Sequence, residues 1–135
     1  MDIPLALVAD YAAADAAGKL NIIGAFNRIT PPEFPYTHPA MHLVIKIQPD
    51  RGEYDDERTA RAELVTEDGR SLLRIEAKFL VPRPPDHIES DMNIILNLFG
   101  VVFEKPGVYD FRIYIDKEQK RTVPLYLIQR PSPEP

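Results

Sequence analysis

The sequence predicts an all-β fold, an antiparallel β-sandwich of about eight strands with an immunoglobulin-like architecture. Apolar and polar residues alternate in several short segments, and this pattern is typical of strands with one buried face. Pro, Gly and Asp interrupt the chain about every 10 to 15 residues. A chain of 135 residues fits one domain. We therefore expect one sandwich domain over residues 1–130 and a Pro-rich flexible tail over residues 131–135.

The first third of the chain contains one ambiguous segment. Pro4–Ala17 is rich in Ala and is followed by Gly18, so its pattern alone fits either a strand or a helix closed by a glycine cap. Lys19–Ile29 is rich in strand-forming residues. Met41–Gln48 places its apolar residues at odd positions, as a half-buried strand does. A stiff extended connection should lie between these strands, because it contains Pro31, Pro32, Pro35 and Pro39.

The middle of the chain predicts a hairpin. Ala60–Val65 alternates weakly, whereas Ser71–Val81 alternates clearly, with Leu73, Ile75, Ala77, Phe79 and Val81 on one face. Between them, Asp68 and Gly69 form a pair that favours a tight type I′ turn.

The last two predicted strands are Val108–Asp116 and Arg121–Gln129. Tyr109 lies at the start of the first, after Gly107 and two residues before an apolar position. This spacing has the form of a tyrosine corner, in which the hydroxyl bonds the preceding loop. Pro124 interrupts the second strand, which indicates an edge or bulge position.

Met92–Phe103 is apolar on both faces. Gly100 permits a bulge that would shift the alternation before the last three residues. A strand of this kind is covered either by a loop of the same monomer or by a subunit or partner. The candidate interface residues are Ile95 and Phe99 of this segment, together with Tyr126 and Ile128, which alternate outward near the C-terminus.

Composition and charge exclude several function classes. The net charge of −5 and the scattered Lys and Arg argue against nucleic acid as a partner. The longest apolar run has about 10 residues, against about 20 for a membrane helix, so we expect no membrane partner and a cytoplasmic protein. The chain has no cysteine, which removes disulfides, thiolate metal ligands and thiol nucleophiles.

Titratable and nucleophilic residues form no recognisable catalytic or metal motif. His38, His42 and His87 are too scattered for a local metal motif, and His42 alternates outward as a surface imidazole. The acidic loop that contains Asp86, Glu89 and Asp91 offers only part of the six to eight oxygens that calcium requires. None of Ser71, Ser90 and Ser132 lies in a nucleophile motif. We expect no cofactor, no metal and no enzymatic activity.

Two polar residues interrupt apolar strands near the N-terminus. Asp10 follows the run Leu5–Ala9, and Asn21 lies on the segment expected to neighbour it. Such residues more often satisfy backbone groups than contact a ligand. We therefore interpret Asp10, Asn21 and Tyr109 as structural polar residues.

The opening of the chain resembles a family of uncharacterised short bacterial proteins. The resemblance rests on the motif ADYA at Ala9–Ala12 and on GKLNIIGAF at Gly18–Phe26, and Glu104–Ile113 is similar to the family's C-terminal hairpin. It implies that Leu5–Ala12 is a strand paired with Lys19–Ile29. No activity is carried over by the resemblance.

These observations favour a non-enzymatic binding or assembly module that pairs with a protein partner or forms a homodimer. The alternative is an enzyme or small-ligand-binding protein whose site is built from loops. In an affinity pull-down from lysate, a protein partner that is recovered reproducibly would favour the binding module, and a co-purifying small molecule would favour the loop-built site.

Overall fold

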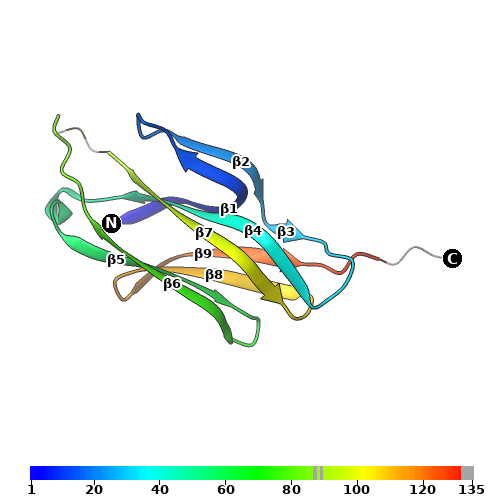
Figure 1. The fold of residues 1–135 in the computed structure, drawn as a ribbon. Coiled ribbons are helices and arrows are strands. Elements are labelled where there is room, and N and C mark those ends of the chain that lie inside the picture. The colour runs from blue at the N-terminus through cyan, green and yellow to red at the C-terminus, as the bar shows by residue number, and fades with distance from the viewer. Residues whose placement is uncertain (87, 89, 132–135) are drawn as a thin grey trace.

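The computed structural model describes residues 1–86, 88 and 90–131, and in this part of the chain it contains nine strands in two sheets packed face to face (Figure 1). One 3-10 helix, Arg51–Glu53, follows the fourth strand. The strands are β1 (Asp2–Ala14), β2 (Leu20–Phe26), β3 (Arg28–Ile29), β4 (Tyr36–Gln48), β5 (Glu57–Val65), β6 (Ser71–Leu80), β7 (Met92–Phe103), β8 (Gly107–Ile115) and β9 (Glu118–Leu127).

The four-stranded sheet has the order β2-β1-β4-β7 and the five-stranded sheet the order β3-β9-β8-β5-β6. All pairs are antiparallel except β3 with β9. The all-β prediction is confirmed, with nine strands instead of about eight. The additional strand arises because Lys19–Ile29 divides at Asn27, whose carbonyl accepts a hydrogen bond from the Tyr126 amide at 2.8 Å. That bond directs the residues after Asn27 to the second sheet.

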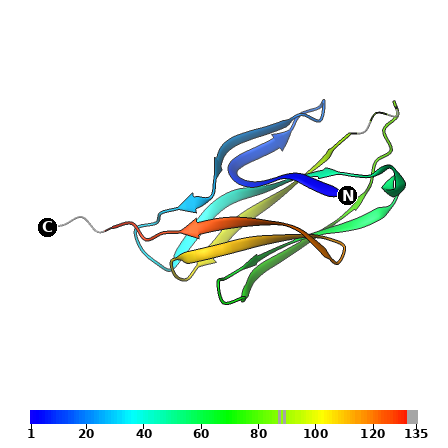
Figure 2. The same ribbon diagram turned by 180° about the vertical axis from the view of Figure 1, so that it is seen from behind.

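The ambiguous segment Pro4–Ala17 is a strand and not a helix, since β1 spans Asp2–Ala14 and pairs with β2. This strand does not run straight. Its first half pairs with β4 as far as Ala9, and its second half turns back over the outer face of its own sheet together with β2 (Figures 1 and 2). We call this projecting hairpin, residues 10–26, the arm.

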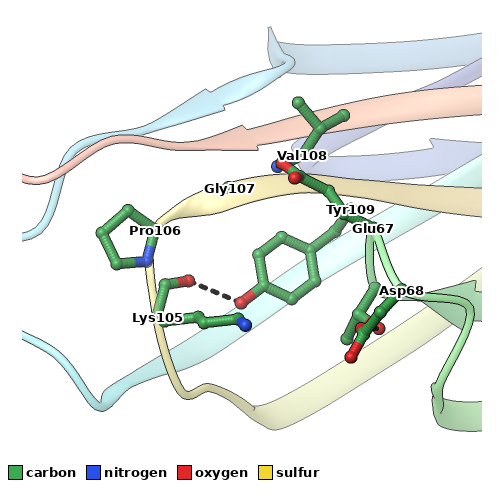
Figure 3. Close-up of a pocket in the computed structure, with 8 residues that line it drawn as sticks. Glu67, Asp68, Lys105, Pro106, Gly107, Val108 and Tyr109 are labelled. Atoms are coloured by element: carbon green, nitrogen blue, oxygen red, sulfur yellow. Dashed lines mark hydrogen bonds between the residues drawn. The ribbon is translucent and has the colours of Figure 1, made fainter.

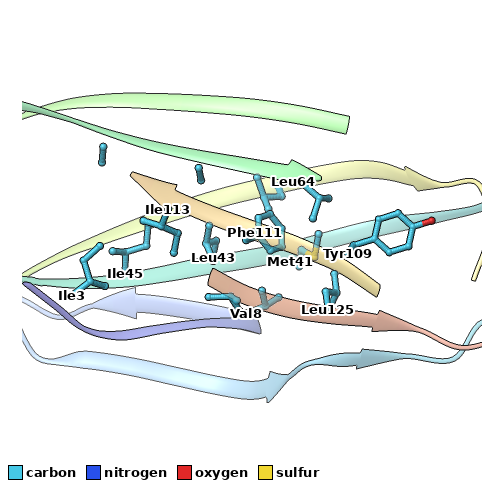
Figure 4. Close-up of a cluster of buried hydrophobic side chains, with 14 of the residues drawn as sticks. Ile3, Val8, Met41, Leu43, Ile45, Leu64, Tyr109, Phe111, Ile113 and Leu125 are labelled. Carbon is cyan, nitrogen blue, oxygen red and sulfur yellow. The ribbon is translucent and has the colours of Figure 1, made fainter. Parts of the chain in front are cut away.

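The hydrophobic core lies between the two sheets (Figure 4). Leu43 and Ile45 of β4 and Phe111 and Ile113 of β8 are completely buried, as their alternation predicts. Each such side chain contributes about 1.5–3 kcal/mol to the free energy of unfolding. The inward residues of β6 are only half-buried, because β6 is the last strand of its sheet.

The turn between β5 and β6 differs from the predicted type I′ turn. The Gly69 amide donates to the Thr66 carbonyl at 3.0 Å, and of the two central residues of the predicted turn only Gly69 has a positive φ, of 85°. The register also shifts between Leu64 and Val65. These features are those of a type I turn followed by a glycine bulge, the usual geometry of a three-residue hairpin loop.

The position predicted for Pro124 is confirmed. It lies in β9, whose outer side pairs with β3 only at Tyr126 and Leu127, so the proline occupies an edge. Among the described residues, no helix is long and apolar enough to cross a membrane.

Candidate functional site

The free edge of β7 is a long strand edge without charged residues. Among the described residues, β7 pairs only with β4, so the backbone groups on its other side have no strand partner. The strand has 12 residues, and none of them is charged. By contrast, the β6 edge of the other sheet carries Arg74, Glu76 and Lys78 on its outer face. Charged side chains on edge strands oppose pairing with other chains, and β7 lacks this protection.

The alternation of β7 changes at Gly100, which has a φ of 64°. Leu98 before the glycine and Val101 after it both point into the core. The expected change of phase therefore occurs, but the expected bulge does not, since the register with β4 is the same on both sides of Gly100. The pairing is preserved because β4 changes phase at the same level, beside Pro39.

This change brings two apolar side chains to the surface close together. Phe99 is 71% exposed and Val102 is 42% exposed, on either side of Gly100. They line a groove of about 550 Å³ between the end of β7 and the start of β6. The groove walls are Arg70, Ser71, Leu72, Leu73, Phe99, Gly100, Val101, Val102 and Glu104.

The arm covers part of the outer face of the sheet. Its tip reaches β7, where the Asn93 Nδ2 atom lies 3.5 Å from the Gly18 carbonyl. Val44, which points to this face, is completely buried, and its neighbour Ile95 is half-buried. The first half of β7 is thus covered within the monomer, whereas Phe99 remains exposed.

His42 lies under the arm and is not the free surface imidazole that its alternation suggested. Its Nδ1 atom accepts a hydrogen bond of 2.7 Å from the Ala12 amide, and its ring lies 5.5 Å from that of Tyr11. The sequence could not predict this contact, because it depends on the bend of β1.

The four candidate interface residues do not form one surface. Ile95 and Phe99 point outward from the four-stranded sheet. Tyr126 and Ile128 alternate outward from the five-stranded sheet, and their amides bond the segment of β3. Since the inner faces of the two sheets pack together, these pairs lie on opposite sides of the molecule. An interface through one sheet can use only one pair.

Asp10 and Asn21 both lie on the arm and are exposed. Asp10 packs against Gly24 of β2, where an added Cβ would lie 3.1 Å from the Asp10 Cβ. The Nδ2 atom of Asn21 donates to the Lys19 carbonyl at 3.3 Å. These contacts are local to the hairpin, so neither residue reaches β7.

A shallow hollow of about 280 Å³ lies beside Asp10 at the base of the arm. His38 lines it, with its Nδ1 atom 3.0 Å from the Tyr36 hydroxyl; its Nε2 atom is buried and has no hydrogen bond of good geometry within the described part of the chain. Burial lowers the pKa of His38, against the opposing charge of Asp10, and so favours the neutral imidazole. The hollow brings an imidazole and a carboxylate to one place, but the described residues around it provide no nucleophile: the other lining residues are Phe26, Arg28 and Ile29.

The loop between β5 and β6 and the loop between β7 and β8 form a pocket of about 260 Å³ around Tyr109 (Figure 3). The Tyr109 hydroxyl donates to the Lys105 carbonyl at 2.5 Å, and the Val108 amide donates to the Glu67 carboxylate at 2.6 Å. The Thr66 hydroxyl donates to the Asp68 carboxylate. The bond from Val108 to Glu67 joins the two loops, and the other two bonds lie within one loop each. The pocket therefore presents few free polar groups to a ligand.

The described residues contain no group of three His, Asp or Glu side chains that could hold a metal ion. His87, Glu89 and Ser132 lie outside these residues, as do residues 132–135 of the expected tail.

The fold and the site define a protein of two packed β-sheets with an uncharged, accessible edge strand. A family model matches residues 4–128, and the chain belongs to the family of unknown function DUF6941. The family membership indicated by the opening motif is thus confirmed. No curated protein matches the chain.

Proposed function

We propose that this protein is a non-enzymatic binding module that pairs an extended protein segment with the free edge of β7. The observation that carries the proposal is a 12-residue edge strand without a charged residue, beside the 71% exposed Phe99. In strand addition, backbone hydrogen bonds provide affinity and pockets for alternate side chains provide specificity. The groove beside Phe99 and Val102 supplies such a pocket.

A loop-built enzyme or ligand site is the weaker alternative. The Tyr109 pocket is a loop-built cavity, but its carboxylates and hydroxyls are engaged in hydrogen bonds with neighbouring loop groups. A catalytic site requires groups that are free to meet a substrate. The β7 edge, in contrast, has no strand partner among the described residues on the side away from β4.

We further propose an immunoglobulin-like topology for the last six strands. In immunoglobulin domains, strands B and E share one sheet, and strands C′, C, F and G follow in this order in the other. β4 and β7 match the first pair, and β6, β5, β8 and β9 match the second set in order. Tyr109 at the start of β8 supports this correspondence, because the tyrosine corner belongs to the start of strand F.

Selection from a phage library of random 12-residue peptides tests the binding proposal. We expect the enriched peptides to be uncharged and β-prone, and to bind Phe99→Lys at least about tenfold more weakly than the wild type. Tyr126→Lys is the matched control, since Tyr126 is an exposed strand aromatic on the opposite sheet. Failure to enrich any peptide, or equal loss of binding in both variants, would contradict the proposal.

A further inference from the structure

We infer that the segment paired with β7 is β7 of a second copy, antiparallel about a two-fold axis at Asn97. The two four-stranded sheets then form one continuous sheet of eight strands. This inference rests on the proposed function and names the partner of the same edge.

The distribution of charge favours a second copy at this edge. The protein has a net charge of −5, so two copies repel each other, and like charges at their contact would add to this repulsion. β6 carries three charged outward residues, and the free part of β9 carries Glu118, Lys120 and Arg121 as well as a proline. These two edges of the five-stranded sheet therefore resist self-pairing. β7 has neither charge nor proline, and an identical strand is equally uncharged.

The outward and inward faces of β7 restrict the register. Directly opposed residues in an antiparallel pair point to the same face. Ile95, Asn97 and Phe99 point outward, whereas Leu96 and Leu98 point inward. The axis must therefore pass through a residue and not between two residues.

A centre at Asn97 gives the best side-chain pairs. It opposes Ile95 to Phe99 of the second copy, Asn97 to its own equivalent, and Leu96 to Leu98 of the second copy. Aromatic and β-branched side chains form favourable cross-strand pairs, and the two amides can hydrogen-bond each other. A centre at Leu96 instead opposes Phe99 to Asn93, and a centre at Leu98 opposes Phe99 to Asn97. A centre at Phe99 opposes the phenyl ring to its own equivalent, but it also opposes the outward Asn97 to the inward Val101. The Asn97 register opposes Phe99 to Ile95 on both strands and keeps opposed side chains on the same face from Ile94 to Gly100, where the alternation of β7 changes.

The two-fold arrangement also closes the assembly. β2, the other edge of this sheet, is uncharged as well, and its pairing with β7 of another copy would be head-to-tail. Such contacts continue into open filaments. β2 is short, with seven residues against the twelve of β7. The longer and self-complementary β7 therefore forms the contact, and the product is a discrete dimer.

Disulfide trapping tests the register, since the chain has no cysteine of its own. In Asn97→Cys the two introduced thiols face each other across the axis, with Cα atoms about 4.5–5.5 Å apart, within disulfide range. We expect oxidation to cross-link this variant at least about tenfold faster than Thr122→Cys, an exposed strand position on the opposite sheet. Equal rates in the two variants would overturn the register.

Light scattering of the wild type, Phe99→Lys and Tyr126→Lys tests the assembly. We expect twice the 15.4 kDa monomer mass for the wild type and for Tyr126→Lys, and a folded monomer for Phe99→Lys. A wild type that is monomeric at high micromolar concentration overturns the dimer. If it still binds selected peptides through Phe99, the proposed function stands and only this inference fails; if it binds none, both fail. Polydisperse masses beyond a dimer would indicate head-to-tail pairing and would also overturn it.

Discussion

Removing the Tyr109 hydroxyl should destabilise the fold measurably. Tyr109 is 3% exposed, and its hydroxyl donates a 2.5 Å hydrogen bond to the Lys105 carbonyl in the loop that precedes β8. Its ring packs edge-to-face on Phe103, with centroids 4.9 Å apart. Tyr109→Phe keeps the ring contact and removes only the hydrogen bond. The variant therefore isolates the contribution of the hydroxyl.

We expect a loss of about 1–2 kcal/mol in the free energy of unfolding, because the Lys105 carbonyl loses its partner in a partly buried site. With an unfolding entropy of about 2.1 cal/mol/K per residue, this loss lowers Tm by about 4–7 °C. Tyr109→Leu also removes the aromatic pair with Phe103, which costs about 0.5–1.5 kcal/mol more.

Urea unfolding measures the change, and Tyr126→Phe is the control because Tyr126 is 39% exposed. The control should unfold at the wild-type midpoint, and Tyr109→Phe at a lower urea concentration with an unchanged slope. If Tyr109→Phe and Tyr126→Phe unfold together, the loop contact contributes nothing and the tyrosine-corner interpretation is refuted.

The pH dependence of stability gives a second measurement of the same hydroxyl. Burial raises the pKa of Tyr109 in the folded state. Below about pH 10, the ordinary pKa of tyrosine, the phenol is neutral in both states and its contribution to stability is complete. Above this pH the unfolded state ionises first, so stability falls as pH rises. Tyr109→Phe should show a smaller alkaline loss than the wild type.

Two further substitutions test a strained glycine in β2 and an ion pair at the turn after β8. Gly24→Ala should lower the free energy of unfolding by about 1–2 kcal/mol in a urea titration, because φ is 69° and the new Cβ meets Asp10. Gly52→Ala is the control, and it should be neutral within about 0.5 kcal/mol because the space around its Cβ is open. Equal unfolding midpoints for the two variants would contradict the strained geometry. Burial raises the pKa of Asp116, but the hydrogen bonds from Arg58 and from the Thr59 amide outweigh it, so the pKa is lowered in the folded state. The Asp116 carboxylate therefore stabilises the fold above its ordinary pKa near 4, and this stabilisation is lost as pH falls. Asp116→Asn should lower the free energy of unfolding by about 0.5 kcal/mol at pH 7 and leave it unchanged at pH 2. A loss of stability that is independent of pH would exclude the charge as its cause.

The sequence alone established that the chain consists of strands and which face of most strands is buried. Alternation is a local property, because successive side chains of a strand point to opposite sides whatever the strand pairs with. Phe111 and Leu43 could therefore be assigned to the core from their neighbours in the chain. The turn between β5 and β6 was located correctly for the same reason, although its type depended on which residue took a positive φ.

The candidate site was only partly predictable. The two apolar faces of Met92–Phe103 and the change of phase at Gly100 were visible in the sequence. The position of β7 at the edge of its sheet was not, since the order of strands in a sheet depends on contacts between residues far apart in the chain. Because strand order is not visible in the sequence, Tyr126 and Phe99 were predicted to share an interface, although the two residues lie in different sheets.

The arm shows most clearly what only the tertiary structure decided. The sequence, with the help of the family resemblance, indicated that β1 and β2 pair. It held no signal that β1 leaves β4 after Ala9 and folds back, so that Gly18 contacts Asn93 and Val44 is buried on the outer face. Local periodicity records which side of a strand is apolar. Packing between segments distant in the chain decides what covers that side. In this protein the arm covers Ile95 in part and leaves Phe99 exposed.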